Sequence, residues 1–199
     1  KDVGNAVTIS GIRFASSACC NELRATDKDD EGNVTDTAAD GIGIMCHELS
    51  HALGLPDFYD TQGTGFGMDL WSVMDYGEYC ANGYCPVGYT AYERDFMGWR
   101  PLQTLTEKGS YVLAPVGADG IGYKVVNPQN ANEYYVLENR QRAGWDRALA
   151  SYGHGLMVTH VDYSASAWNS NKVNSNQNHQ RMTIIAANDR YIGSSASRD

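Results

Sequence analysis

Residues 40–54, which read DGIGIMCHELSHALG, are the most strongly patterned segment of the chain. Their apolar side chains recur on one face of a 3.6-residue period, which predicts an amphipathic helix. These apolar residues are Ile42, Met45, Cys46, Leu49, Ala52 and Leu53. Gly54 stands where a left-handed C-cap would end such a helix, and Pro56 prevents the helix from resuming. We therefore expect a helix over residues 40–54.

Two histidines of this helix, His47 and His51, are four residues apart. Side chains at that spacing project from one helix face, about one turn apart, and this face is opposite the apolar one. Glu48 follows the first histidine, where its carboxylate can reach a metal-bound water without ligating the metal. Two neutral imidazoles, a third protein ligand and an open position are typical of catalytic zinc, with the carboxylate as general base. The spacing therefore predicts a catalytic zinc site.

The third zinc ligand is predicted to be Asp57, which comes six residues after His51. Gly54 lets the chain turn sharply between them. The whole pattern is similar to the long zinc-binding motif of the metzincins, with Asp in place of the commoner third His. Glu78 and Glu93 remain alternatives, because a separate segment donates the third carboxylate in thermolysin-like enzymes.

The segment WSVMDY, residues 71–76, resembles the Met-turn of the same clan. The resemblance implies that Met74 lies beneath the zinc. It also implies a catalytic role for Tyr76, two residues later, because this tyrosine contacts the metal or the transition-state oxyanion in some members.

Three blocks carry a resemblance to one bacterial peptidase family: HELSHALGLPDFYDT, GFGMDLWSVMDYG and PVGYTAYERDFMGW. Residues 40–100 resemble the family typified by immune inhibitor A. The resemblance implies a secreted or surface-attached zinc metalloendopeptidase that hydrolyses peptide bonds of proteins. It also implies a two-part catalytic domain, often with structural calcium. By position, the resemblance makes His47 and His51 ligands, Glu48 the base and Asp57 the third ligand.

Calcium has two candidate locations. Asp60 and Asp69 flank a glycine-rich loop and are candidates by the family resemblance. Residues 27–36 carry carboxylates at alternate positions, as an EF-hand loop does, but Ala38 stands where the bidentate Glu is expected. We therefore interpret residues 27–36 as a solvated acidic loop.

The fold predicted for the chain is α+β. Residues 1–108 are expected to form a metzincin-like zinc-peptidase core, N-terminally short, with a strand over 6–14 and a second helix over 89–99. Residues 109–199 are expected to form an antiparallel β-rich part, because short β-like runs alternate there with turn residues. These runs are YVLAPV, IGYKVVN, EYYVLENRQ, GLMVTHVDY and RMTIIAAND. Residues 164–180, rich in Asn and Ser, are expected to be a long loop.

Composition limits the partners. A net charge of −9 argues against binding nucleic acid or anionic lipid, both of which require a basic surface. No apolar run approaches the roughly 20 residues that cross a bilayer. Few Lys and many Asn, Ser, Gly and Tyr residues fit an exported protein, which we expect to be a monomer. Because the chain begins at Lys1, we expect any signal peptide or pro-segment to lie outside it.

The five cysteines also favour an oxidising compartment. Cys80 and Cys85 bracket a turn-like stretch and are candidates for a local disulfide. Cys46 is a candidate partner of Cys19 or Cys20, and the sequence does not choose between them.

His154 and His160 share a face of a predicted strand and are interpreted as ordinary strand histidines.

The alternative to an enzyme is a binding or adhesion module on an inactive peptidase scaffold, favoured by the Tyr and Trp content and the short N-terminal part. The intact Glu48 favours the enzyme, since an inactive relative commonly loses the general base.

Overall fold

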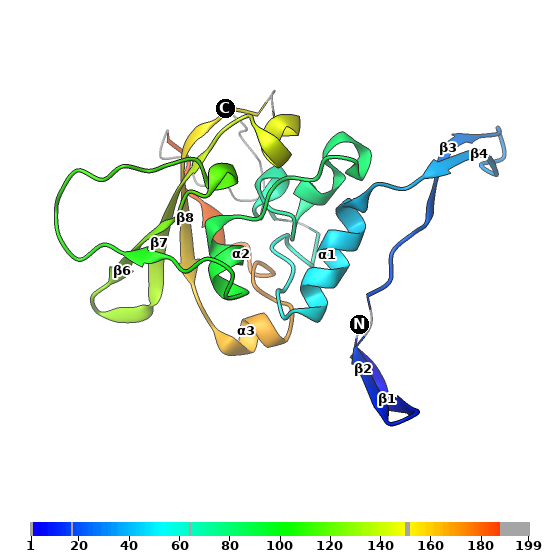
Figure 1. The fold of residues 1–199 in the computed structure, drawn as a ribbon, viewed down its shortest axis with the longest axis horizontal. Coiled ribbons are helices and arrows are strands. Elements are labelled where there is room, and N and C mark those ends of the chain that lie inside the picture. The colour runs from blue at the N-terminus through cyan, green and yellow to red at the C-terminus, as the bar shows by residue number, and fades with distance from the viewer. Residues whose placement is uncertain (1, 17, 64, 150–151, 188–199) are drawn as a thin grey trace.

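The computed structural model describes residues 2–16, 18–63, 65–149 and 152–187, and it has the predicted α+β composition (Figure 1). Two hairpins precede helix α1, and a five-stranded sheet follows it. The hairpins are β1 (Asp2–Ile9) with β2 (Ile12–Ser16) and β3 (Leu23–Lys28) with β4 (Val34–Ala39). Both hairpins stand away from the rest of the chain in Figure 1.

The hairpins correct two predictions. The single strand expected over residues 6–14 reverses at Ser10 and Gly11, which have φ values of 51° and 81°. Such left-handed residues form the tight turn of a two-residue hairpin loop. The acidic loop expected over residues 27–36 is a turn flanked by the ends of β3 and β4. The Asp29 carboxylate accepts hydrogen bonds from the backbone and side chain of Asn33 and so closes this turn.

Helix α1 spans Ile42–Ala52, and Gly54 follows with a φ of 103°, as expected for a left-handed C-cap. The histidine face of α1 packs against the rest of the chain, and His47 is buried there. The apolar residues of the opposite face, at positions 42, 45, 49 and 53, are 44–52% exposed. Gly43 lies where α1 crosses the segment 76–83, and a Cβ there would be 1.9 Å from the carbonyl oxygen of Glu78. This close contact explains a glycine inside a helix.

The segment after α1 is built from short elements. The 3₁₀ helix η1 (Asp69–Trp71) leads into the predicted Met-turn, and η2 (Tyr76–Gly83) follows. Helix α2 spans Ala91–Phe96, shorter than the predicted 89–99. Thr90 and Glu93 form a reciprocal capping box that begins α2, and Gly98, with a φ of 70°, follows its end.

The sheet has the order β5-β6-β7-β8-β9. Its strands are β5 (Gln103–Thr104), β6 (Tyr123–Asn127), β7 (Asn130–Arg140), β8 (Gly155–Asp162) and β9 (Met182–Ile184). All neighbouring strands of this sheet are antiparallel except β5 and β6, which are parallel. The prediction of an antiparallel β-rich part is therefore correct for strands β6, β7, β8 and β9. The run YVLAPV is an exception, because it forms no strand beyond a bridge between Pro115 and Asn139. The last two residues of RMTIIAAND lie outside the described part.

Three short elements complete the second half: η3 (Val116–Ala118), η4 (Gly144–Leu149) and α3 (Ala165–Asn169). Helix α3 interrupts the long loop expected over residues 164–180. The predicted boundary at residue 108 is crossed by a common hydrophobic core. In that core the rings of Phe58, Tyr92 and Trp168 lie edge to face, with centroids 5.8–6.4 Å apart.

The structure also tests the candidate disulfides. All five cysteines lie in the described residues and all are free, so neither candidate disulfide is present in this structure. Cys80 and Cys85 are buried, and the thiol of Cys85 lies 3.3 Å from the carbonyl oxygen of Trp145.

Among the described residues, no helix has the length and apolar character that crossing a membrane requires.

Candidate metal centre

Three side chains of the predicted zinc site meet at one point. The Oδ1 atom of Asp57 lies 3.0 Å from Nε2 of His47 and 3.1 Å from Nε2 of His51. The two imidazoles are nearly perpendicular, with centroids 4.6 Å apart. The ligand atoms all lie within 4.8 Å of one another, as a set that could hold one metal ion does. Within the described residues, Asp57 Oδ1 has no hydrogen bond of good geometry, although it is buried.

Backbone carbonyls orient both imidazoles. Nδ1 of His47 lies 2.9 Å from the carbonyl oxygen of Val73, and Nδ1 of His51 lies 2.7 Å from that of Leu55. A carbonyl oxygen only accepts hydrogen bonds, so both histidines carry their proton on Nδ1 when neutral. Each Nε2 is then left with its lone pair toward Asp57. Metal-binding histidines have this arrangement in general, and two imidazoles with one carboxylate form a donor set suited to zinc.

Asp57 is held from the far half of the chain. Its backbone N–H donates to Oδ1 of Asn171 at 2.7 Å, and Nδ2 of Asn171 donates to Oδ2 of Asp57 at 2.5 Å. Nothing in the sequence pattern indicated Asn171, which follows α3 and is separated from Asp57 by 114 residues.

The charges of this cluster reinforce one another. Burial lowers the pKa of His47, but Asp57, Glu78 and the Val73 carbonyl together raise it to about 9. Burial alone would raise the pKa of Asp57, but the two imidazoles and Asn171 hold it well below its usual range. A cation bound at this point would compete with protons for the Nε2 atoms of the two histidines.

An open cleft of about 500 Å³ gives access to this cluster. Glu48 lines the cleft together with both histidines and Asp57, so the structure brings the predicted base beside the predicted ligands. Tyr59 lines it as well and was not expected there. Burial and the nearby Asp57 carboxylate raise the pKa of Tyr59, which therefore stays protonated as a hydrogen-bond donor. The lining is completed by Gly54, Leu55, Pro56, Trp168, Asn169 and Asn171.

The predicted Met-turn lies against the histidine face of α1. Met74 is fully buried, and its backbone N–H donates to Oγ of Ser72. Its carbonyl accepts from the N–H of Phe58, which joins the turn to the segment that carries Asp57. The turn also supplies the Val73 carbonyl that orients His47.

The two alternative third ligands lie elsewhere. Glu78 Oε2 is 3.6 Å from Nδ1 of His47, on the side of the ring away from the three converging atoms. Glu93 is buried in the capping box of α2, where it accepts from the Ser72 hydroxyl and the Thr90 N–H. Of the three candidates, Asp57 is the one grouped with both histidines.

Tyr76 is outside the metal cleft. It is 59% exposed and lines a neighbouring hollow of about 130 Å³ together with Asp60, Asp69 and Asp75. The structure therefore places the two calcium candidates of the sequence in one hollow. The carboxylate of Asp75 accepts from the N–H groups of Met68 and Asp69.

A buried ionic cluster holds the sheet to the site. Arg140 of β7 pairs with Glu138 and Asp146, at 2.9 and 2.7 Å. Its guanidinium also donates to the carbonyl oxygens of Trp71 and Gly88. The sheet therefore supports both the Met-turn and the segment that follows it.

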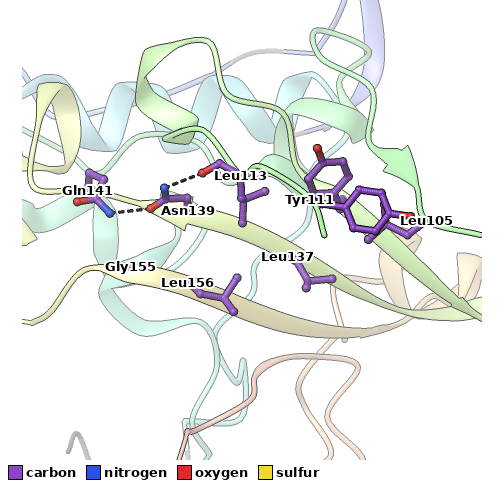
Figure 2. Close-up of a pocket in the computed structure, with 9 residues that line it drawn as sticks. Leu105, Tyr111, Leu113, Leu137, Asn139, Gln141, Gly155 and Leu156 are labelled. Atoms are coloured by element: carbon purple, nitrogen blue, oxygen red, sulfur yellow. Dashed lines mark hydrogen bonds between the residues drawn. The ribbon is translucent and has the colours of Figure 1, made fainter. Parts of the chain in front are cut away.

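A second hollow, of about 550 Å³, lies on the sheet (Figure 2). Its lining is mainly apolar, and it includes Tyr111, Leu137 and Leu156. At one end of it, the side-chain amide of Asn139 donates to the Leu113 carbonyl and accepts from the Gln141 amide (Figure 2). No residue of the metal cleft lines this hollow.

Three histidines lie outside the candidate metal centre, and two of them contact a carboxylate. His160 contacts Glu133 at 3.0 Å, and His179 contacts Asp162 at 2.7 Å. His154 is exposed in the segment before β8. The interpretation as an ordinary strand histidine fits His160, whereas His154 lies just before β8, so the two do not share a face of one strand.

Comparisons with known proteins point to the same region. Residues 27–100 match the family described as immune inhibitor A peptidase M6, catalytic domain. Pre-pro-metalloprotease PrtV of Vibrio cholerae serotype O1 is 39% identical over 59 residues, which are 28% of this chain and 6% of that protein. Immune inhibitor A of Bacillus thuringiensis subsp. alesti is 39% identical over 59 residues, which are 28% of this chain and 9% of that protein. No solved structure matches the chain significantly.

The matched stretch spans less than a tenth of either relative. The family match over residues 27–100 contains α1, the predicted ligands and the Met-turn, which are the parts on which the sequence-based resemblance rested. That resemblance is confirmed over residues 27–100, where the chain matches the catalytic domain of the immune inhibitor A peptidase family.

Proposed function

We propose that this chain is the catalytic part of a zinc metalloendopeptidase that hydrolyses peptide bonds of proteins. The observation that carries the proposal is the convergence of His47, His51 and Asp57 on one point of a cleft that Glu48 also lines. The match of residues 27–100 to the immune inhibitor A peptidase family and the partial similarity of the chain to a metalloprotease support the same proposal.

Each residue has a distinct task in this proposal. His47, His51 and Asp57 would hold the metal, with the Nδ1 protons of the histidines committed to backbone carbonyls. Zinc bound there would lower the pKa of a water ligand and polarise the substrate carbonyl. Glu48 accepts the proton of the attacking water and passes it to the leaving amine. From the Met-turn resemblance, Tyr76 is the candidate for a contact with the oxyanion.

The test compares the intact protein with its Glu48→Gln variant in casein or peptide hydrolysis, after loading with zinc. We expect kcat to fall at least about 100-fold with little change in zinc content, since general base catalysis contributes roughly 10²–10⁴-fold. Glu107→Gln, at an exposed position outside the cleft, is the matched control. Equal activity of Glu48→Gln and wild type would reject the base. A protein that binds zinc and cleaves no peptide of a broad library would support the inactive scaffold instead.

Structural calcium is part of the proposal. Asp60, Asp69 and Asp75 line one hollow, and carboxylates are preferred calcium ligands. Calcium should raise the unfolding temperature of the wild type but not of Asp60→Asn, and no shift in the wild type would reject the site. We further propose that the protein is exported, in line with its composition, and that it is a monomer.

A further inference from the structure

The aspartate of the candidate metal centre is oriented by a side chain from the other end of the fold. Asn171 makes two hydrogen bonds to the same residue: its amide oxygen accepts from the N–H of Asp57, and its amide nitrogen donates to Oδ2. An asparagine amide has a donor and an acceptor side by side, so it fixes both the backbone and the carboxylate of Asp57.

This pairing gives the two carboxylate oxygens of Asp57 different partners. Oδ2 is occupied by Asn171, whereas Oδ1 is buried and directed at Nε2 of both histidines. Rotation of the carboxylate would break the bond to Asn171. The bond therefore selects Oδ1 as the oxygen that faces the metal position.

The backbone at Asn171 is suited to this task. Its φ of 55° is left-handed, a conformation that asparagine tolerates better than most residues. The hydroxyls of Thr61 and Ser175 bond at 2.7 Å, and Asn174 bonds to the Phe58 carbonyl, so the two segments are joined independently of Asp57. The contact that reaches a predicted ligand comes from Asn171.

We propose that Asn171 is a positioning residue that holds Asp57 in the geometry for monodentate zinc binding. This inference rests on the proposed metal site. Outer-shell partners of metal ligands typically contribute 10–100-fold to metal affinity. The site is then completed only when the segment after α3 lies against the segment that carries Asp57.

The test measures zinc affinity with a competing chromophoric chelator, and the visible spectrum of the cobalt-substituted protein. Asn171→Gly removes the amide without the strain that alanine would have at this φ, and Asn171→Asp keeps its shape but replaces the donor by a carboxylate. We expect both to weaken zinc binding about 10–100-fold and to change the cobalt spectrum.

Two controls separate orientation from general weakening of the fold. Thr61→Val removes the hydroxyl bonds from Thr61 to Ser175 and to the backbone carbonyl of Asn171, and leaves the side-chain amide of Asn171 in place. Asn82→Gly makes the same change as Asn171→Gly at an exposed residue that also has a φ of 55°. Both should bind zinc within about threefold of the wild type, well inside the 10–100-fold range expected for an outer-shell partner.

The possible outcomes are distinct. Wild-type zinc affinity and cobalt spectrum in both Asn171 variants would overturn the inference. An equal loss of zinc affinity in Thr61→Val would also overturn the inference, because weaker attachment of the two segments would then be enough to explain the loss. A wild type that binds no zinc would reject the metal site and this inference together. A wild type that binds zinc without cleaving peptides would reject the peptidase but leave the role of Asn171 supported if its variants bind weakly.

Discussion

Nδ1 of His47 lies 2.9 Å from the carbonyl oxygen of Val73, which joins the first predicted ligand to the Met-turn. The imidazole is thus oriented before a metal arrives, and its Nε2 lies 3.0 Å from Asp57. Such a preformed site binds metal in the folded state but not in the unfolded chain, so metal binding stabilises the fold.

Zinc should therefore raise the unfolding temperature of the chelator-treated protein. A ligand at about 100 times its Kd stabilises by about 2.7 kcal/mol. We expect His51→Ala to lose this shift in differential scanning calorimetry, because it removes a ligand from the cluster. His160→Ala, at a histidine of β8 outside the cluster, should keep it. An undiminished shift in His51→Ala would place the zinc elsewhere.

The stability of the metal-free protein should fall between about pH 4 and pH 7 because of Asp75. Burial, together with the nearby Asp69, raises the pKa of this carboxyl to about 7, against the hydrogen bonds from backbone N–H groups, which lower it. The folded state then binds the proton more tightly than the unfolded chain, in which the carboxyl has its ordinary pKa of 3.8. Stability is lost as pH rises through this window, and the loss is complete above about 7.

Urea unfolding at pH 5 and pH 8, both in chelator, measures this effect. The Asp75→Asn variant should show a smaller difference between the two pH values than the wild type. Whether the substitution lowers stability overall is irrelevant to this comparison. If the pH difference is unchanged in the variant, another group is responsible for it.

Arg140 should be essential for stability, although it lies on the sheet. Its guanidinium is buried between Glu138 and Asp146, so Arg140→Met leaves two buried carboxylates without their cation. Breaking a buried ion pair in this way costs about 3–5 kcal/mol. Arg147→Met, at an exposed position of η4, should cost less than about 1 kcal/mol. Denaturant unfolding of the two variants tests this, and similar losses would contradict the role of the buried cluster.

The orientation of α1 yields a further prediction. Leu49 and Leu53 are each 51% exposed, whereas Leu55, just beyond the helix, is 2% exposed. Leu49→Gln and Leu53→Gln should change the free energy of unfolding by no more than about 0.5 kcal/mol. Leu55→Ala should cost about 2–5 kcal/mol, because it leaves a cavity in the core. Comparable losses at positions 49 and 53 would mean that the apolar face of α1 is covered in solution.

Local patterns predicted the parts of this protein that local chemistry determines. The spacing of His47 and His51 and the glycine at position 54 depend on helix geometry alone, and the helix and its end lie where expected. The capping box at Thr90 is equally local. Periodicity does not tell which side of a helix its neighbours cover, so it did not reveal that the histidine face of α1 is the buried one.

Long-range contacts could not be predicted in this way. Asn171 is one of many asparagines in a polar stretch, and its bond to Asp57 spans 114 residues. From the sequence alone, Arg140 is likewise expected to be a surface residue at the end of a strand. Only the structure shows that it is buried and pairs with Glu138 and Asp146. These side chains owe their roles to tertiary packing, and a single sequence contains no periodic signal for it.

Two tyrosines compete for a role in catalysis, and kinetics can separate them. Tyr59 lines the metal cleft beside Asp57, whereas Tyr76 follows the Met-turn and is exposed in the adjoining hollow. If Tyr76 contacts the oxyanion, Tyr76→Phe should lower kcat about 100-fold, because loss of one such donor costs roughly 10²–10³. Its zinc affinity should be that of the wild type, since Tyr76 touches no predicted ligand in this structure.

Tyr59→Phe should act differently, because its hydroxyl lies close to the Asp57 carboxylate. We expect weaker zinc binding and a kcat that recovers when zinc is in excess. Steady-state kinetics at saturating zinc, together with zinc titrations, distinguish the two variants. Wild-type kcat in Tyr76→Phe would reject the role inferred from the Met-turn resemblance. A fall in kcat that persists in Tyr59→Phe at saturating zinc would assign the oxyanion contact to the tyrosine that already lines the cleft.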